Sequence, residues 1–231
     1  MHKRILGLLS AAAFIGVAAG AQAADGWYVS GDVGAAFLQD SSSTAADGFG
    51  NSIDFDTEFD PGFGVHGAVG HSWDGFRLEG EVSYRKNDLD TLTVTNVTLA
   101  GIGSFDVAAE FDAEGDVSAL GFMANGWYDF DTESPWKPFI GGGVGTARIS
   151  LNETSATIAG VSAPLADDED WVFAYQAGAG IGYELTPTII VSLGYRFFGT
   201  LDPEFTAVDG ITTFDGEYRS HNIEIGVRLH F

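Results

Sequence analysis

Residues 219–231, RSHNIEIGVRLHF, indicate the fold class. Apolar side chains occupy every second position, at Ile223, Ile225, Val227, Leu229 and Phe231, and polar or small residues fill the positions between them. Successive side chains of a β-strand point to opposite faces, so this pattern predicts a strand with one apolar and one polar face. The segment exceeds the roughly 9 to 11 residues that a tilted strand needs to cross a bilayer.

Seven other segments show the same alternation. They are residues 27–38, 61–73, 76–88, 116–130, 136–151, 170–185 and 187–199. Short links at 74–75, 131–135 and 186–187 alternate with long links at 39–60, 89–115, 152–169 and 200–218. Membrane barrels join their strands by short periplasmic turns and long extracellular loops, whereas a soluble β-sandwich has no reason for this regular order. The sequence therefore predicts an all-β chain that folds as an eight-stranded antiparallel up-and-down transmembrane β-barrel.

The N-terminus has the layout of a secretory signal peptide. Lys3 and Arg4 precede an uncharged stretch at residues 5–20, and Ala21-Gln22-Ala23 forms a small-residue cleavage site. We expect a cleaved signal peptide at 1–23 and a single barrel domain at 24–231. The alternative is an N-terminal anchor helix, but the stretch is short for a helical span, which needs about 18 to 20 apolar residues.

Composition limits the classes of partner. The chain holds 33 acidic and 10 basic residues, which argues against nucleic acid as a partner. Cysteine is absent, so neither a disulfide nor the lipidated cysteine of a lipoprotein is available. The spans 39–60, 88–116, 152–170 and 200–218 contain 23 of the acidic residues and no lysine or arginine. We expect a strongly negative outer rim that concentrates cations.

The polar face of the predicted strands carries charged side chains of both signs. An eight-stranded barrel leaves an interior just wide enough for side chains, so these charges are expected to pair inside the lumen. The predicted lumen ion-pair network consists of Arg77, Glu79, Glu81, Arg85, Glu184, Arg196, Glu224 and Arg228. Two interpretations remain open, a structural plug and a narrow cation-conducting path. The register of the Gly-rich fifth segment is also open, and Arg148 faces either the lumen or the outer rim.

Aromatic residues gather near the segment ends, as the interfacial girdles of a membrane barrel require. The predicted periplasmic girdle is Trp27, Trp73, Phe76, Tyr128, Phe130, Trp136, Tyr183 and Phe231. The predicted outer girdle is Phe37, Phe63, Tyr84, Trp171, Phe173 and Phe197.

Two acidic runs suggest divalent cations. Asp54, Asp56, Glu58 and Asp60 alternate along one predicted loop, and Asp167-Asp168-Glu169-Asp170 is continuous. Hard cations such as Ca²⁺ take several oxygen ligands, so both runs are speculative cation sites, although neither completes an EF-hand loop. The alternative is ordinary solvated loops, and no other metal site and no cofactor are expected.

No catalytic arrangement is visible. His66, His71, His221 and His230 do not fit a Ser/His/acid set that can be placed on one site, and His71-Ser72 is adjacent, so the two side chains point to opposite faces. Barrels that trim lipid A use an outward His and Ser two residues apart, and that pattern is missing. We therefore expect that the protein is not an enzyme.

Four stretches resemble a known family. They are 123–130 (MANGWYDF), 138–145 (PFIGGGVG), 177–183 (AGAGIGY) and 226–231 (GVRLHF). Their order and spacing resemble the OmpA/OmpX-like eight-stranded barrels, and more closely the porin-like or opacity-type surface antigens that share an outer membrane protein beta-barrel domain. The resemblance implies a monomer in the outer membrane of a Gram-negative cell, in contact with outer-membrane lipids and lipopolysaccharide, with extracellular loops.

The C-terminal pattern of Ile225, Val227, Leu229 and Phe231 resembles the signal read by the outer-membrane assembly machinery, with Leu229 where an aromatic residue is often found. Family members serve as envelope components, surface antigens, adhesins or minor channels, without common catalytic residues. The resemblance thus implies a structural, surface-exposed envelope component with acidic extracellular loops. A narrow cation-selective channel and a lipid A-modifying enzyme are the alternatives.

Overall fold

The computed structural model describes residues 25–158 and 161–231, so the predicted signal peptide lies outside the described residues. In this part of the chain, all regular secondary structure is β-strand. The strands are β1 (Gly26–Leu38), β2 (Ser41–Ala46), β3 (Ser52–Phe59), β4 (Gly62–Trp73), β5 (Phe76–Leu99), β6 (Gly103–Asp129), β7 (Trp136–Ile158), β8 (Val161–Thr186), β9 (Ile189–Thr200), β10 (Glu204–Thr206), β11 (Thr213–Asp215) and β12 (Arg219–His230). Within the described ranges, no helix is long and apolar enough to cross a membrane.

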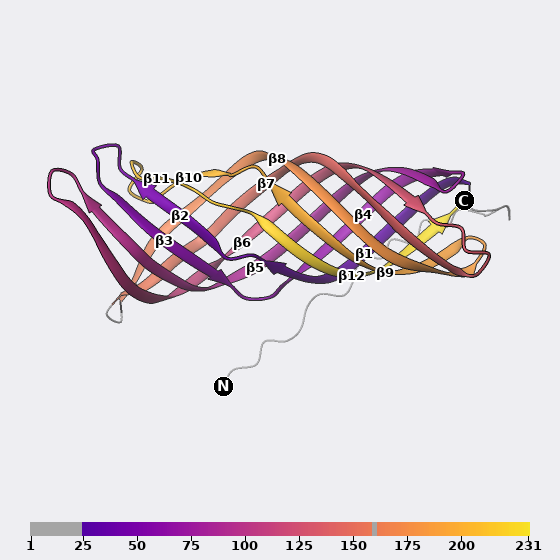
Figure 1. The fold of residues 1–231 in the computed structure, drawn as a ribbon, viewed down its shortest axis with the longest axis horizontal. Coiled ribbons are helices and arrows are strands. Elements are labelled where there is room, and N and C mark those ends of the chain that lie inside the picture. Colours follow the sequence, from indigo (N-terminus) through magenta and orange to yellow (C-terminus); the bar gives the residue numbers. More distant parts are fainter. Residues whose placement is uncertain (1–24, 159–160) are drawn as a thin grey trace, which may run out of the picture.

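Eight of these strands close into a ring, which we call the membrane barrel (Figure 1). Its order is β1, β4, β5, β6, β7, β8, β9 and β12, and β12 pairs with β1 to complete the circle. All neighbours are antiparallel. In the turn between β4 and β5, Asp74 and Gly75 have φ angles of 49° and 81°, and positive φ at both central residues is the geometry of the tightest hairpin turns. The predicted fold class is confirmed.

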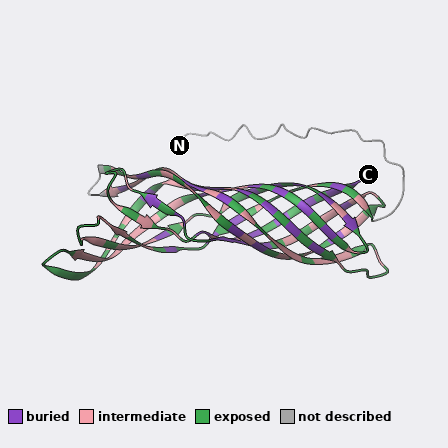
Figure 2. Cartoon of the chain, turned by 90° about the horizontal axis from the view of Figure 1, so that it is seen from above, coloured by how far each residue is buried: buried purple, intermediate pink, exposed green. Residues whose placement is uncertain are grey.

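The side chains of the membrane barrel are arranged inside out compared with a soluble protein. On β12, Ile225 is 62% exposed, whereas Glu224 and Arg228 are 5% and 6% exposed. The same alternation runs along the other strands of the ring (Figure 2). Because a charged side chain turned toward lipid at mid-depth costs roughly 2 to 4 kcal/mol, the apolar face must be the outer one.

Aromatic pairs mark both ends of this apolar surface. Near the short turns, the ring centroids of Phe76 and Tyr128 lie 4.8 Å apart, as do those of Trp136 and Tyr183. At the opposite end, Phe122 stacks on Trp171 at 6.1 Å. Aromatic side chains prefer the membrane interface, so these pairs bracket the membrane-spanning part of the barrel.

Four strands continue far beyond the outer aromatic residues. In the structure, β5 has 24 residues, β6 has 27, β7 has 23 and β8 has 26. The sequence predicted shorter strands, whose outer ends lie at residues 88, 116, 151 and 170. At about 3.3 Å per residue, β6 alone is roughly 90 Å long, about three times the thickness of the hydrocarbon core. Acidic residues suggested loops here, but an outward carboxylate on a strand is equally well solvated.

The long links form a second closed ring, which we call the outer barrel. It consists of β2, β3, β10 and β11 together with the extended parts of β5 to β8 (Figure 1). The segment after β10 reaches β8 through a bridge between Ala166 and Ala207, and the Val208 N–H donates to the Leu165 carbonyl at 2.9 Å. The predicted loops are therefore largely an ordered continuation of the barrel.

Candidate functional site

In the middle of the lumen, two carboxylates, one arginine and one histidine from four strands form a closed circuit, which we call the charge circuit. The guanidinium of Arg196 on β9 contacts the carboxylate of Glu81 on β5, and its Nε lies 3.2 Å from Oε2 of Glu224 on β12. His66 on β4 completes the circuit, because its Nε2 is 3.2 Å from Glu224 and its Nδ1 is 3.6 Å from Glu81. All four side chains are almost fully buried. Each charge is thus held by partners on other strands of the ring.

A third carboxylate, Glu79, is held mainly by neutral donors, with Nη1 of Arg77 3.8 Å away. The Tyr28 hydroxyl and the Trp127 indole N–H each donate to it at 2.7 Å, and the Asn125 amide donates to it at 3.1 Å. The Asn125 amide also donates to Glu81 at 2.9 Å, which joins this cluster to the charge circuit. A buried carboxylate needs such hydrogen bonds because its desolvation is otherwise unfavourable.

The periplasmic end of the network is organised by Asp129, which the sequence pattern did not single out. Its carboxylate lies 2.9 Å from Nε of Arg77 and 2.7 Å from Nη1 of Arg228. Glu184 was predicted for the network, but it lies at the periplasmic mouth beside Asp131 and Lys137. Its parity points inward, but among the described residues no ion pair joins it to the arginines, which pair with Asp129.

Arg85 covers the outer side of the network. This side chain is 0% exposed, and its guanidinium carbon lies 4.0 Å from the centre of the Phe198 ring. The Tyr218 ring packs edge-on against Phe198, with centroids 6.0 Å apart. Cation and aromatic rings attract one another in this geometry. The three side chains form a layer between the charged lumen and the outer barrel.

Small residues make room for this filling. A Cβ atom added at Gly143 on β7 would collide with the Asn125 amide oxygen and with the backbone of β6. The Gly-rich sequence of the fifth membrane strand therefore follows from the size of the side chains opposite it. The register of that strand places Arg148 opposite Leu120 and Trp171, and Nη1 of Arg148 lies 3.0 Å from Glu169 in a partly exposed pair. Arg148 belongs to the outer rim.

The two acidic runs occupy different places on the outer barrel. Asp54, Asp56 and Glu58 lie at alternate positions of β3, whose other face turns Phe55 and Thr57 into the barrel. Alternate residues of a strand are about 7 Å apart, whereas the oxygens around one Ca²⁺ lie about 2.3 to 2.6 Å from it. Across residues 25–158 and 161–231, no three acidic or histidine side chains are grouped as a metal site.

Part of the second run has a structural role. Asp168 accepts a hydrogen bond from the Thr206 N–H at 2.8 Å, and Asp170 accepts one from the Glu204 N–H at 3.1 Å. These contacts attach β10 to β8 and so help to close the outer barrel. Asp167 and Glu169 of the same run are exposed and add to the negative charge of the extension.

Known proteins share this architecture. The model of a family described as "Surface antigen" matches residues 32–228, which is most of the chain. The chain belongs to the surface antigen family. Relatives of this surface antigen include the outer membrane protein PagN of Salmonella typhimurium, which is 25% identical over 73% of each chain. The opacity protein opA60 of Neisseria gonorrhoeae is 26% identical over 71% of this chain and 76% of its own length.

A solved structure supports the fold. The outer membrane protein OprG of Pseudomonas aeruginosa superimposes with a TM-score of 0.51 at 16% identity, covering 90% of this chain and 98% of that chain. This surface antigen is accordingly an outer-membrane β-barrel protein, and the predicted location in the cell outer membrane is confirmed.

Proposed function

We propose that this protein is a non-enzymatic envelope component that acts through its outer barrel, which it holds outside the membrane, and that its lumen does not conduct. The observation that carries the proposal is the contrast between the two barrels. The lumen is filled by partnered charges and capped by Arg85, Phe198 and Tyr218. The outer barrel, in contrast, presents an ordered, acidic surface to the medium.

The geometry of the lumen argues for a plug. Arg196 is held by two carboxylates and Asp129 by two arginines, so an ion that passed would have to break pairs that are already desolvated. Removing one partner of such a buried pair typically costs about 3 to 5 kcal/mol. A cation path has no specific support in these contacts.

The positions of the histidines argue against catalysis. His66 is enclosed in the charge circuit between Glu81 and Glu224, with 6% of its surface exposed, and has no serine or other nucleophile among its described partners. His221 lies on the outer aromatic surface, where it contacts the Tyr195 hydroxyl at 2.6 Å. Neither arrangement brings a nucleophile, a base and an orienting group together.

Planar-bilayer recording tests the closed lumen. We expect that the refolded protein produces no steady conductance steps above those of the bare bilayer, while an open porin in the same bilayer serves as the positive control. A reproducible cation-selective step from the wild-type protein would overturn the closed-lumen part of the proposal.

Cysteine labelling tests the exposure of the outer barrel. The natural chain has no cysteine, so Ile102→Cys at the tip of the β5–β6 hairpin and Glu133→Cys in a short turn each provide one thiol. On intact cells, a membrane-impermeant maleimide is expected to label the first variant and not the second. Equal labelling of both variants on intact cells would contradict the proposed display.

A further inference from the structure

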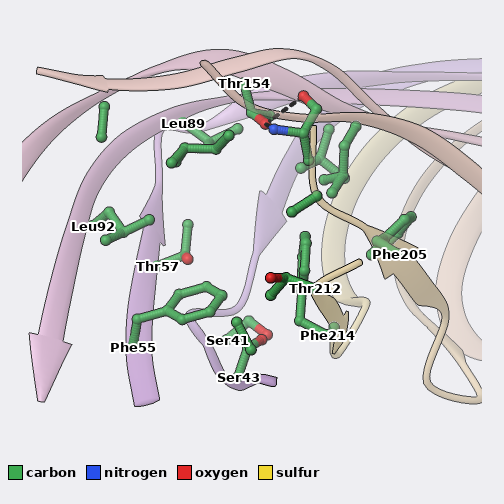
Figure 3. A pocket seen from close by; sticks show the side chains of 18 of the residues that line it. Ser41, Ser43, Phe55, Thr57, Leu89, Leu92, Thr154, Phe205, Thr212 and Phe214 are labelled. Carbon is green, nitrogen blue, oxygen red and sulfur yellow. Dashed lines mark hydrogen bonds between the residues drawn. The ribbon is translucent and has the colours of Figure 1, made fainter. Parts of the chain in front are cut away.

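The outer barrel holds a cavity of about 420 Å³ that is partly open to the medium. Figure 3 shows Phe55, Leu89 and Leu92 on one side of it and Phe205 and Phe214 on the other. These residues come from β3, β5, β10 and β11, and further apolar side chains of β6, β7 and β8 complete the wall. The cavity is therefore a product of the second ring, and it does not belong to the charged lumen.

The polar groups of the wall are largely occupied by the protein itself. The Thr154 hydroxyl donates to the Ala166 carbonyl at 2.6 Å and accepts from the Ala166 N–H at 3.0 Å (Figure 3). The Ser41 hydroxyl accepts from the Glu217 N–H at 3.0 Å. The Asp209 carboxylate accepts hydrogen bonds from its own turn. Within the described part of the chain, no lysine or arginine lines the cavity.

Tyr218, at the floor of the cavity, is the exception. It is 2% exposed, it lines the cavity, and its hydroxyl has no hydrogen-bond partner among the described residues. The hydroxyl itself is fully buried, so Tyr218 contributes its aromatic ring to the wall and offers no accessible donor to the cavity. Below this residue the cavity is closed by the ring of Phe198.

We propose that the outer barrel binds a small, uncharged, apolar molecule in this cavity. The volume lies in the range of about 300 to 1,000 Å³ that ligand pockets occupy. An apolar cavity of about 150 Å³ in another protein stays dry and holds benzene, so this cavity has room for a fused aromatic ring system or a medium-length alkyl chain. The acidic outer surface repels anions, which selects an uncharged ligand over a fatty-acid anion.

The probe for a binding test is an uncharged propionyl-dimethylamino-naphthalene dye, whose emission shifts to the blue in apolar surroundings. The protein is placed in lipid nanodiscs, and the signal of empty nanodiscs is subtracted. We expect a saturable 1:1 component for the wild-type protein. Octanol is expected to displace the dye, and octanoate at neutral pH is not.

Two variants locate the site. Leu92→Trp fills the cavity and is expected to weaken dye binding at least tenfold, whereas Ile102→Trp adds the same indole at a hairpin tip, where Ile102 is 72% exposed, and leaves binding unchanged. Each variant must first show the strand circular dichroism of the folded wild type.

Several results would overturn the proposal. These are a lack of saturable binding by the wild type, equal binding by a folded Leu92→Trp variant, or displacement by octanoate that is stronger than displacement by octanol. If Leu92→Trp does not fold, Phe55→Trp on the facing strand β3 takes its place and must give the same loss.

Discussion

The charge circuit of the lumen leads to a quantitative prediction for Glu81→Gln. Glu81 is 3% exposed and contacts Arg196 and His66, and it accepts hydrogen bonds from two amides. Neutralising it leaves the buried Arg196 with one carboxylate, Glu224, in place of two. Breaking a buried pair costs about 3 to 5 kcal/mol, and because Glu224 remains we expect a loss near 3 kcal/mol in the free energy of unfolding.

Equilibrium unfolding in guanidinium chloride, followed by tryptophan fluorescence of protein in lipid vesicles, measures this loss. The matched control is Arg148→Gln, which breaks the pair with Glu169 at the outer rim, where the side chains are 38% and 53% exposed. Exposed pairs contribute at most about 1 kcal/mol. A loss for Glu81→Gln that does not exceed the loss for Arg148→Gln would refute the reasoning.

A double-mutant cycle separates the pair from its surroundings. Glu81→Gln combined with Arg196→Gln removes both members of the contact, so the double variant is expected to lose at least about 1 kcal/mol less than the sum of the single losses. Additive losses would mean that the two side chains stabilise the barrel independently, and the contact between them would then contribute nothing to the free energy of unfolding.

Three further predictions follow from other parts of the structure. Ile225→Arg places a charge on the lipid-facing surface and should lower the free energy of unfolding by about 2 to 4 kcal/mol. Ile102→Arg at the solvated hairpin tip should change it by less than about 0.5 kcal/mol. The same denaturation assay compares the two variants. Phe231→Ala should lower the amount of folded protein in the outer membrane of cells, measured by blotting of membrane fractions, while purified protein still refolds into vesicles. Burial raises the pKa of Tyr218 to about 12, so the unfolded chain loses this proton first and stability should fall as pH rises from about 10 to about 12. Phenolate absorbance should show one fewer late-titrating tyrosine in Tyr218→Phe than in the wild type.

The membrane barrel was predictable because lipid imposes a strict rule on every strand that crosses it. The alternation in residues 219–231 and the order of short and long links were sufficient to predict the strand number and direction. Outside the lipid, strands no longer need an apolar outer face. Beyond the outer aromatic residues an acidic side chain can lie on a loop or on the wet face of a strand, so the extension of β5 to β8 was missed.

The lumen shows a similar limit. Parity identified which charged side chains point inward, but it did not tell at what depth two of them meet. Asp129 and Glu184 both point inward, and only the strand register places Asp129 between two arginines. His66 was missed because a single histidine between glycine-rich neighbours carries no sign of its partners on other strands. Cross-strand neighbours depend on register and barrel stagger, which the alternation alone does not determine.

The second ring changes what a macromolecule in the medium would meet. Because backbone pairing holds these segments, an antibody against a linear peptide of 89–99 would meet a strand that is already paired on both sides rather than a free loop. Substitutions at outward positions and at the hairpin tip 100–102 leave the backbone pairing in place, whereas inward side chains pack within the two rings. The surface can therefore vary its chemistry at every second residue while its shape stays the same.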